Sequence, residues 1–284
     1  MSLSRADRQL VALLRGCALL AAAIVLFILL FLMRESWPIL QHVALTRFIT
    51  DASWHPVENL YQLTPMLSAT LYSTIGALLL ATPLGIGSAL FIRFYAPVFL
   101  AIVYRRLIEL LAGIPSVVYG FWGLTTLAPL IGRVHPPGVS LLTGILILTL
   151  MILPTVALTV DAALVAVPNA YIRGAAALGL SRWGLIGGVA LPAARSGIAA
   201  GILLAAGRAI GETMAVLMVA GNVVEQPHSL FDSVRTLTAN IALEMAYATG
   251  DHRAALFVSG MALMSMVLVL VGLVEYFTKE RRHV

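Results

Sequence analysis

Two opposite charges lie inside an apolar stretch of this sequence. Arg208 and Glu212 occur in the string Gly-Arg-Ala-Ile-Gly-Glu at 207–212, and the segment 196–219 around them has no other charged residue. Side chains four residues apart in a helix lie on nearly the same face, so these two can pair. An unpaired arginine at the centre of a membrane helix costs about 2.5–3.5 kcal/mol, so we expect the pair to face protein or a water-filled path.

Two interpretations of this pair are open. Small residues share its helical face, because Gly197, Gly201 and Ala215 fall within about 40° of Arg208 at about 100° per residue, and small residues let another helix approach closely. The pair is then a buried ionic lock between two helices. Alternatively, Arg208 supplies positive charge for an anion that crosses the membrane, since a guanidinium can bind two oxygens of a tetrahedral oxyanion together. Glu212 would then hold Arg208 when the site is empty.

The composition indicates an all-α membrane protein. Of 284 residues, 60% are hydrophobic and 11% are charged, and the mean hydropathy is +0.97. Soluble domains are about 25% charged, so this composition excludes them. The net charge of +5 does not indicate nucleic-acid binding, because the single lysine is Lys279 and the arginines stand at the ends of apolar stretches.

Six apolar stretches are long enough to cross a bilayer, which takes about 20 helical residues. They are 11–33, 66–91, 107–131, 139–160, 196–219 and 254–277. Lipid offers no partners to backbone polar groups, so these stretches must be helical. The first stretch is longer than a signal-peptide core and lacks a small-residue cleavage site, so we expect it to be an uncleaved helix. Pro83, Pro115 and Pro154 lie inside spans and can kink them.

The distribution of Lys and Arg predicts that both termini are cytoplasmic. With the N-terminus inside, the inner set is Arg5, Arg8, Arg15, Arg93, Arg105, Arg106, Arg173, Arg182, Arg195, Lys279, Arg281 and Arg282. The outer set is smaller and comprises Arg34, Arg47, Arg133, Arg235 and Arg253. The segments 34–65 and 221–253 are then external, as solvated loops with interfacial anchors or as docking surfaces for a partner. The segment 161–192 is internal.

The internal segment contains a short helix of small residues, 171–179, that ends at Gly179. Taken alone, it fits an interfacial helix or a docking element equally well. The segment resembles the cytoplasmic loop of ABC importer permeases, which has the form Glu-Ala-Ala, three residues, Gly, nine residues, Ile-x-Leu-Pro. Gly179 and the pair Leu191-Pro192 stand at the matching positions, and Val189 replaces the isoleucine.

Within that superfamily, the chain resembles phosphate permease subunits of the PstC type. Three strings carry the resemblance: Gly-Ile-Pro-Ser-Val-Val-Tyr-Gly at 113–120, Gly-Arg-Ala-Ile-Gly-Glu-Thr-Met-Ala-Val at 207–216 and Leu-Thr-Ala-Asn-Ile-Ala at 237–242. Thr213 and Met214 favour phosphate, since related sulfate and molybdate permeases have Phe-Gly after the glutamate. The resemblance runs from about residue 60 to the C-terminus.

The resemblance implies the type I ABC importer permease fold with six transmembrane helices. An N-terminal helix and external loop, 1–65, would precede a permease domain, 66–284, whose coupling loop is 161–192. It implies a substrate path that includes Arg208, Glu212 and Thr213. It also implies contact with an ATPase through Arg173, Gly174, Ala175, Ala176 and Gly179. Arg173 and Gly174 replace the family's Glu and Ala, so we expect a compensating acidic residue on the partner.

The implied partners are a second, homologous permease that completes a heterodimer, a cytoplasmic ATPase dimer that binds ATP and Mg, and an external phosphate-binding protein. All would assemble at a bacterial inner membrane. The chain itself is expected to be a transport subunit without a cofactor or a metal site, not an enzyme. With Lys279 as its sole lysine, it has no Gly-Lys-Ser/Thr nucleotide loop. A permease for another oxyanion and a gradient-driven secondary transporter are the alternatives.

Overall fold

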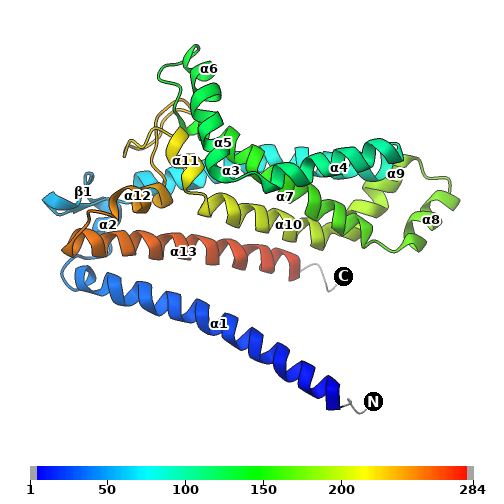
Figure 1. Cartoon of the computed structure of the whole chain (residues 1–284), viewed down its shortest axis with the longest axis horizontal. Coiled ribbons are helices and arrows are strands. Elements are labelled where there is room, and N and C mark those ends of the chain that lie inside the picture. The colour runs from blue at the N-terminus through cyan, green and yellow to red at the C-terminus, as the bar shows by residue number, and fades with distance from the viewer. Residues whose placement is uncertain (1–4, 280–284) are drawn as a thin grey trace.

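The computed structural model describes residues 5–279, with side chains described for residues 9–272 (Figure 1). Arg281 and Arg282, which the charge pattern assigns to the inner set, lie outside these residues. So does the C-terminal end of the predicted permease domain, 66–284.

Five helical segments among the described residues are long and apolar enough to cross a membrane. Three are the single helices α1 (Arg5–Leu40), α7 (Leu141–Val165) and α13 (Gly250–Lys279). The helix α3 (Thr64–Leu90) continues into the π-helical segment η2 (Phe91–Tyr95). The helix α10 (Leu191–Gly211) follows α9 (Arg182–Leu185) and the π-helical segment η4 (Ile186–Ala190). Pro83 and Pro154 lie inside α3 and α7, which continue past them.

The third predicted span is broken by a sharp bend. The helix α4 (Val98–Gly113) meets a second helical segment, Ser116–Gly132, at 93°. That segment consists of α5 (Ser116–Trp122), η3 (Gly123–Leu127) and α6 (Ala128–Gly132). Ile114 and Pro115 between them are extended, with ψ of 127° and 142°, because a proline disfavours helical geometry in the residue before it. A single helix over 107–131 is therefore wrong, although the bent pair counted as one span gives the predicted six.

The fifth predicted span also breaks. The helix α10 ends at Gly211, Glu212 is extended with ψ of 128°, and α11 (Met214–Val219) begins after Thr213. The prediction of one helix over 196–219 is therefore wrong. The helical segment instead starts earlier, at Arg182, so Arg208 lies in its last turn and not in its middle.

Small residues let the central helices pack closely. The helix α7 packs against α3, α4 and α10. A Cβ atom added to Gly85 of α3 would lie 2.7 Å from Val156 Cγ1, and one added to Gly201 of α10 would collide with Thr159 Oγ1. This confirms that the glycines of the fifth stretch admit a neighbouring helix. The helix α13 packs on α10 and on α1, and the N-terminal half of α1 diverges from the other helices (Figure 1).

The segments outside the spans gather at opposite ends of the molecule (Figure 1). One end carries α2 (Arg47–Thr50), the two-stranded antiparallel sheet of β1 (Trp54–His55) and β2 (Leu60–Tyr61), and α12 (Leu237–Glu244). A short 3-10 helix, η1 (Pro56–Glu58), joins the two strands. The other end carries α8 (Asn169–Ala177) and α9. The predicted internal segment is shorter than 161–192, because α7 extends to Val165 and includes Asp161.

Candidate functional site

The two helix breaks lie side by side. The helix α5, which follows the first break, packs against α11, which follows the second. A Cβ atom on Gly120 of α5 would lie 2.9 Å from the Ala215 Cα of α11, so the two backbones are in close contact. Tyr119, Ala215 and Val219 form a buried cluster with Ile147 and Met151 of α7. Residues almost 100 positions apart in the sequence are thereby joined into one site.

Side chains satisfy backbone carbonyls at both breaks. Tyr119 Oη donates a hydrogen bond to the Leu111 carbonyl at 2.9 Å. Thr238 Oγ1 of α12 donates to the Glu212 carbonyl at 2.9 Å, and Thr213 Oγ1 donates to the Gly211 carbonyl at 3.2 Å. An unpaired carbonyl inside hydrocarbon would cost several kcal/mol. The breaks are therefore ordered features of the fold.

Glu212 does not pair with Arg208. Its Oε1 accepts a hydrogen bond from the Ala215 N–H at 3.1 Å, which caps the start of α11. The predicted pairing assumed one continuous helix, in which residues four apart share a face. Because α10 ends at Gly211 and Glu212 is extended, that geometry does not exist here. The predicted pairing, on which both the ionic lock and the role of Glu212 in an empty site depend, is therefore wrong for this conformation.

Arg208 has no counter-charge in contact. Its guanidinium forms no hydrogen bond or ion pair with another described residue. The residue is exposed on this single chain. It lines a crevice of about 490 Å³ between α10 and α13, whose other lining residues, such as Leu204 and Val271, are apolar or glycine. The α10 C-terminus stabilises a positive charge by only about 0.3–1 kcal/mol, so Arg208 still needs an external partner.

The internal segment forms the expected short helix at the other end of the molecule. Ala175 of α8 is buried and Ile172 packs on the central core, whereas Arg173, Gly174 and Ala176 are exposed. Gly179 ends the helix with a φ of +76°. The hydrogen bonds Gly179 N to Ala176 O and Leu180 N to Ala175 O form the glycine-dependent cap that this φ allows. The free face of α8 is thus available to another protein.

A cluster of hydrogen-bonded polar side chains joins the two predicted external segments. Glu244 of α12 is buried and accepts hydrogen bonds from Arg235 Nη1 at 2.7 Å, Trp54 Nε1 at 2.9 Å and His252 Nε2 at 2.8 Å. Arg235, Glu244 and His252 lie within 18 positions of one another, so the nearness of these charged groups in the sequence is a signal for this cluster. Trp54 could not be found in that way, because it lies 190 positions from Glu244. Through Thr238 of α12, the cluster is linked to the break at Glu212.

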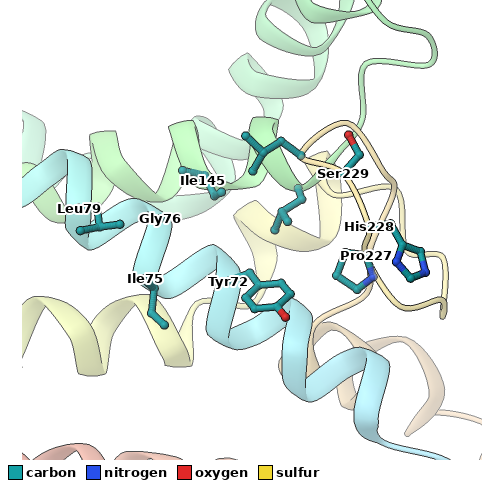
Figure 2. Close-up of a pocket in the computed structure, with 10 residues that line it drawn as sticks. Tyr72, Ile75, Gly76, Leu79, Ile145, Pro227, His228 and Ser229 are labelled. Carbon is teal, nitrogen blue, oxygen red and sulfur yellow. The ribbon is translucent and has the colours of Figure 1, made fainter.

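A cavity of about 470 Å³ lies near the same end (Figure 2). Tyr72, Ile75 and Leu79 of α3 form one wall, and Pro227, His228 and Ser229 form the facing wall (Figure 2). Asp232 Oδ2 holds that loop by accepting the N–H groups of His228 at 2.8 Å and Ser229 at 2.7 Å. These two donors hold the pKa of the Asp232 carboxyl below its ordinary value of 3.8. The lining is largely apolar, which suits contact with another chain or with lipid better than an ion.

No group of three or more His, Cys, Asp or Glu residues that could hold a metal ion occurs in the part of the chain that the structure describes. The groups at the two breaks that could act on a solute are the guanidinium of Arg208, the carboxylate of Glu212 and three hydroxyl groups, those of Tyr119, Thr213 and Thr238.

Comparison with known proteins gives a consistent family signal. Residues 81–283 match the family described as "Binding-protein-dependent transport system inner membrane component". The probable ABC transporter permease protein YqgH of Bacillus subtilis is 36% identical, over 98% of this chain and 94% of its own length. The phosphate transport system permease protein PstC of Mesorhizobium japonicum is 35% identical, over 90% and 86%. That of Haemophilus influenzae is 32% identical, over 89% and 88%.

Solved structures share the fold at low sequence identity. A chain of the bacterial alginate ABC transporter, in complex with its alginate-bound periplasmic protein, superposes with a TM-score of 0.66 at 16% identity, over 99% of both chains. A chain of the inward-facing MetNI methionine ABC transporter gives a TM-score of 0.59 at 17% identity, over 77% of this chain and 93% of its own. The fold is that of type I ABC importer permeases, as predicted.

Proposed function

This chain belongs to the family of binding-protein-dependent transport system inner membrane components, and from that premise we propose that it is one permease subunit of an ATP-driven phosphate importer. The family makes it an ABC permease subunit. Several relatives are named as phosphate permeases, whereas the name of the Bacillus relative states no substrate. The choice of phosphate as the substrate must therefore be supported by the residues of the site.

The unpaired guanidinium of Arg208 is the observation that carries the proposal. It lies beside two broken helices, and irregular backbone at membrane depth occurs only in protein or along a water-filled path. Arg208 has no carboxylate in contact within the described residues. An oxyanion would supply the missing negative charge and accept two guanidinium N–H groups at once.

Glu212 gives a reason for phosphate over sulfate. Its Oε1 is used by the Ala215 N–H, while no hydrogen bond to its Oε2 is found in the described part of the chain. Phosphate near neutral pH carries a proton that this oxygen can accept. Sulfate carries none, so a carboxylate beside it would only repel it.

The exposure of Arg208 on this chain supports a second permease subunit. A guanidinium left in contact with acyl chains is costly, so a homologous partner that covers this face would form the other half of the path. The free face of α8 would bind one protomer of a cytoplasmic ATPase dimer, which supplies ATP and Mg. The opposite end, with α2 and α12, would receive a phosphate-binding protein outside a bacterial inner membrane. The excess of basic residues at the α8 end supports cytoplasmic termini.

The direct test is transport by the complete importer in proteoliposomes. We expect Arg208→Ala to lower phosphate uptake about 100-fold or more, because two charge-assisted hydrogen bonds are worth about 3 kcal/mol or more. Subunit assembly should stay normal. Arg133→Ala, which removes an exposed arginine elsewhere, is the control for lost charge. Normal phosphate uptake by the Arg208 variant would overturn the proposal, and preferred uptake of sulfate would assign the path to another oxyanion.

Coupling to the ATPase is tested at α8. Ala176→Trp adds bulk to the exposed face of this helix, so we expect ATP hydrolysis to lose its dependence on phosphate-loaded binding protein and uptake to fall at least tenfold. Ala176 is the better position than Gly179, where any side chain is strained by the φ of +76°. Ala21→Trp, on an exposed face of α1, is the matched control. Uptake that persists without any ATPase would favour a gradient-driven transporter.

A further inference from the structure

A second charged cavity lies at the end of the molecule that carries α8. It has a volume of about 570 Å³ and lies between η2 and α4, whose lining residues run from Val98 to Glu109. Three arginines line it: Arg93 from η2, and Arg105 and Arg106 from α4. The only acidic residue in the lining is Glu109. This cavity is separate from the crevice at Arg208, which lies between α10 and α13.

The charges of this cavity are only partly balanced within the chain. Arg105 forms an ion pair with Asp161 of α7, whose side chain is buried. Arg106 Nη1 lies 2.8 Å from Glu109 Oε2 on the surface of α4. For Arg93, no hydrogen bond or ion pair with another described residue is found. Three positive and two negative side chains leave one uncompensated positive charge.

Two further features favour an anion in this position. The ion pair with Asp161 holds Arg105 in place, while a guanidinium has five N–H donors and can still offer some of them to the cavity. The helix α4 starts at Val98, which also lines the cavity, and no side chain caps it. The first N–H groups of a helix lack internal partners and form its positive end. Side chains and backbone thus present positive charge together.

The rim of the cavity is apolar and exposed. Val98 and Ile102 of the lining are 78% and 56% exposed, and the adjacent Phe99 is 77% exposed, so this surface is largely free of contacts with the described residues. A small inorganic anion would need the arginines but not this rim. An anionic phospholipid would use both, with its phosphate at the guanidinium groups and its acyl chains along Val98, Phe99 and Ile102.

The place of the cavity in the fold fits a lipid headgroup. The lining residues of the cavity belong to η2, α4 and the connection between them, and η2 joins α3 to α4. This junction lies toward the end of the molecule that carries α8 and α9 (Figure 1). Basic cavities between such helices, at the level of the headgroups, are suited to anionic lipids. We propose that Arg93, Arg105 and Arg106 form a binding site for the phosphate of an anionic phospholipid. The proposal depends on the membrane location of the chain and not on the transported substrate.

The test is native mass spectrometry of the purified complex titrated with dioleoyl phosphatidylglycerol or dioleoyl phosphatidylcholine. We expect phosphatidylglycerol to bind at least tenfold more tightly to the wild type. Arg93→Gln with Arg106→Gln should reduce that preference about 25-fold or remove it, since each arginine near the surface contributes about fivefold. Arg105 is left intact, because its removal would leave Asp161 buried without a partner.

Two controls keep the result decisive. Arg133→Gln with Arg253→Gln removes two exposed arginines at the other end of the molecule, and the lipid preference should survive. The single variant Arg93→Gln, which disrupts no ion pair, should lose about fivefold if the double variant does not fold. Equal binding of the two lipids, or an unchanged preference in both arginine variants, would overturn the proposal. Displacement of phosphatidylglycerol by millimolar inorganic phosphate would assign the site to free phosphate instead, and would also overturn it.

Discussion

Arg235, in the predicted external segment 221–253, and Arg208, in the last turn of α10, differ in their surroundings. Arg235 donates hydrogen bonds to the Asn222 carbonyl at 2.9 Å, to Asn240 Oδ1 at 3.1 Å and to Glu244 Oε1 at 2.7 Å. Its side chain is 19% exposed. Arg208 is exposed and has no such partner among the described residues. An arginine with a complete set of partners holds segments together, whereas one without them is free to bind a solute.

The backbone carbonyls near Arg208 have hydrogen-bond partners, although the guanidinium of Arg208 has none among the described residues. At both helix breaks the freed carbonyls are satisfied by side chains, namely Tyr119, Thr213 and Thr238. The described residues thus provide hydrogen-bond partners for the backbone at the breaks but none for the guanidinium of Arg208. Since an unpaired charge is far more costly than an unpaired carbonyl in a low-dielectric environment, we infer that the partner of Arg208 comes from outside the chain.

The largest expected difference between the two arginines is in stability. Arg235→Ala should lower the free energy of unfolding by about 3 kcal/mol or more, because it leaves Glu244 buried with a lost ion pair. Arg208→Ala should change it by less than about 0.5 kcal/mol, as at sites without partners. Thermal unfolding of the purified protein in detergent measures both. Equal losses would show that Arg208 also has a structural role.

Lysine substitutions separate charge from geometry. Arg208→Lys keeps the positive charge but loses the planar pair of donors, so we expect phosphate uptake to fall about tenfold, less than for Arg208→Ala. Uptake in proteoliposomes is the measurement, at saturating concentrations of binding protein. A lysine variant as inactive as the alanine variant would show that the fork is essential, and a fully active one that charge alone is enough.

Removal of a single hydroxyl tests the link between α12 and the second break. Thr238→Val deletes the hydrogen bond to the Glu212 carbonyl at nearly constant volume, so we expect a loss of about 1–3 kcal/mol in stability from the unpaired carbonyl. Thr125→Val is the matched control, because its hydroxyl bonds to the Phe121 carbonyl of its own helical segment and is exposed. Similar small losses of stability in both variants would show that the hydrogen bond from Thr238 contributes no more than an exposed hydrogen bond within one helix.

The smallest effect on stability is expected at Asp232. Its carboxylate lies near the surface and accepts hydrogen bonds from local backbone N–H groups. The N–H groups of His228 and Ser229 depress its pKa in the folded state, so the unfolded state binds more protons and stability increases with pH. The contribution is complete above the ordinary value of 3.8 and is lost as the pH falls through the lower folded pKa. The protection factors for amide hydrogen exchange in the segment 228–232, which correct for the intrinsic pH dependence of the exchange rate, should therefore fall at low pH, and Asp232→Asn should remove this dependence.

The sequence was sufficient for features that depend on composition over a helix length. Four of the six apolar stretches, the short helix α8 and its end at Gly179 follow from hydropathy and glycine chemistry, and the structure confirms them. The stretches 107–131 and 196–219 are apolar as predicted but are broken helices. The family resemblance was carried by short strings such as 207–216, and the family match confirms it. The roles of Arg208 and of the α8 residues stay predictions.

Only the tertiary structure decided where the helices break and which side chains meet. Pro115 was a signal for the first break, but a hydropathy window of about 20 residues averages over a two-residue interruption and cannot show the second one at Glu212. The pairing of Arg208 with Glu212 failed for the same reason, because spacing predicts a contact only where the helix is continuous. The contacts of Glu244 with Trp54 and of Arg105 with Asp161 depend on how distant helices pack, and no local pattern encodes that packing.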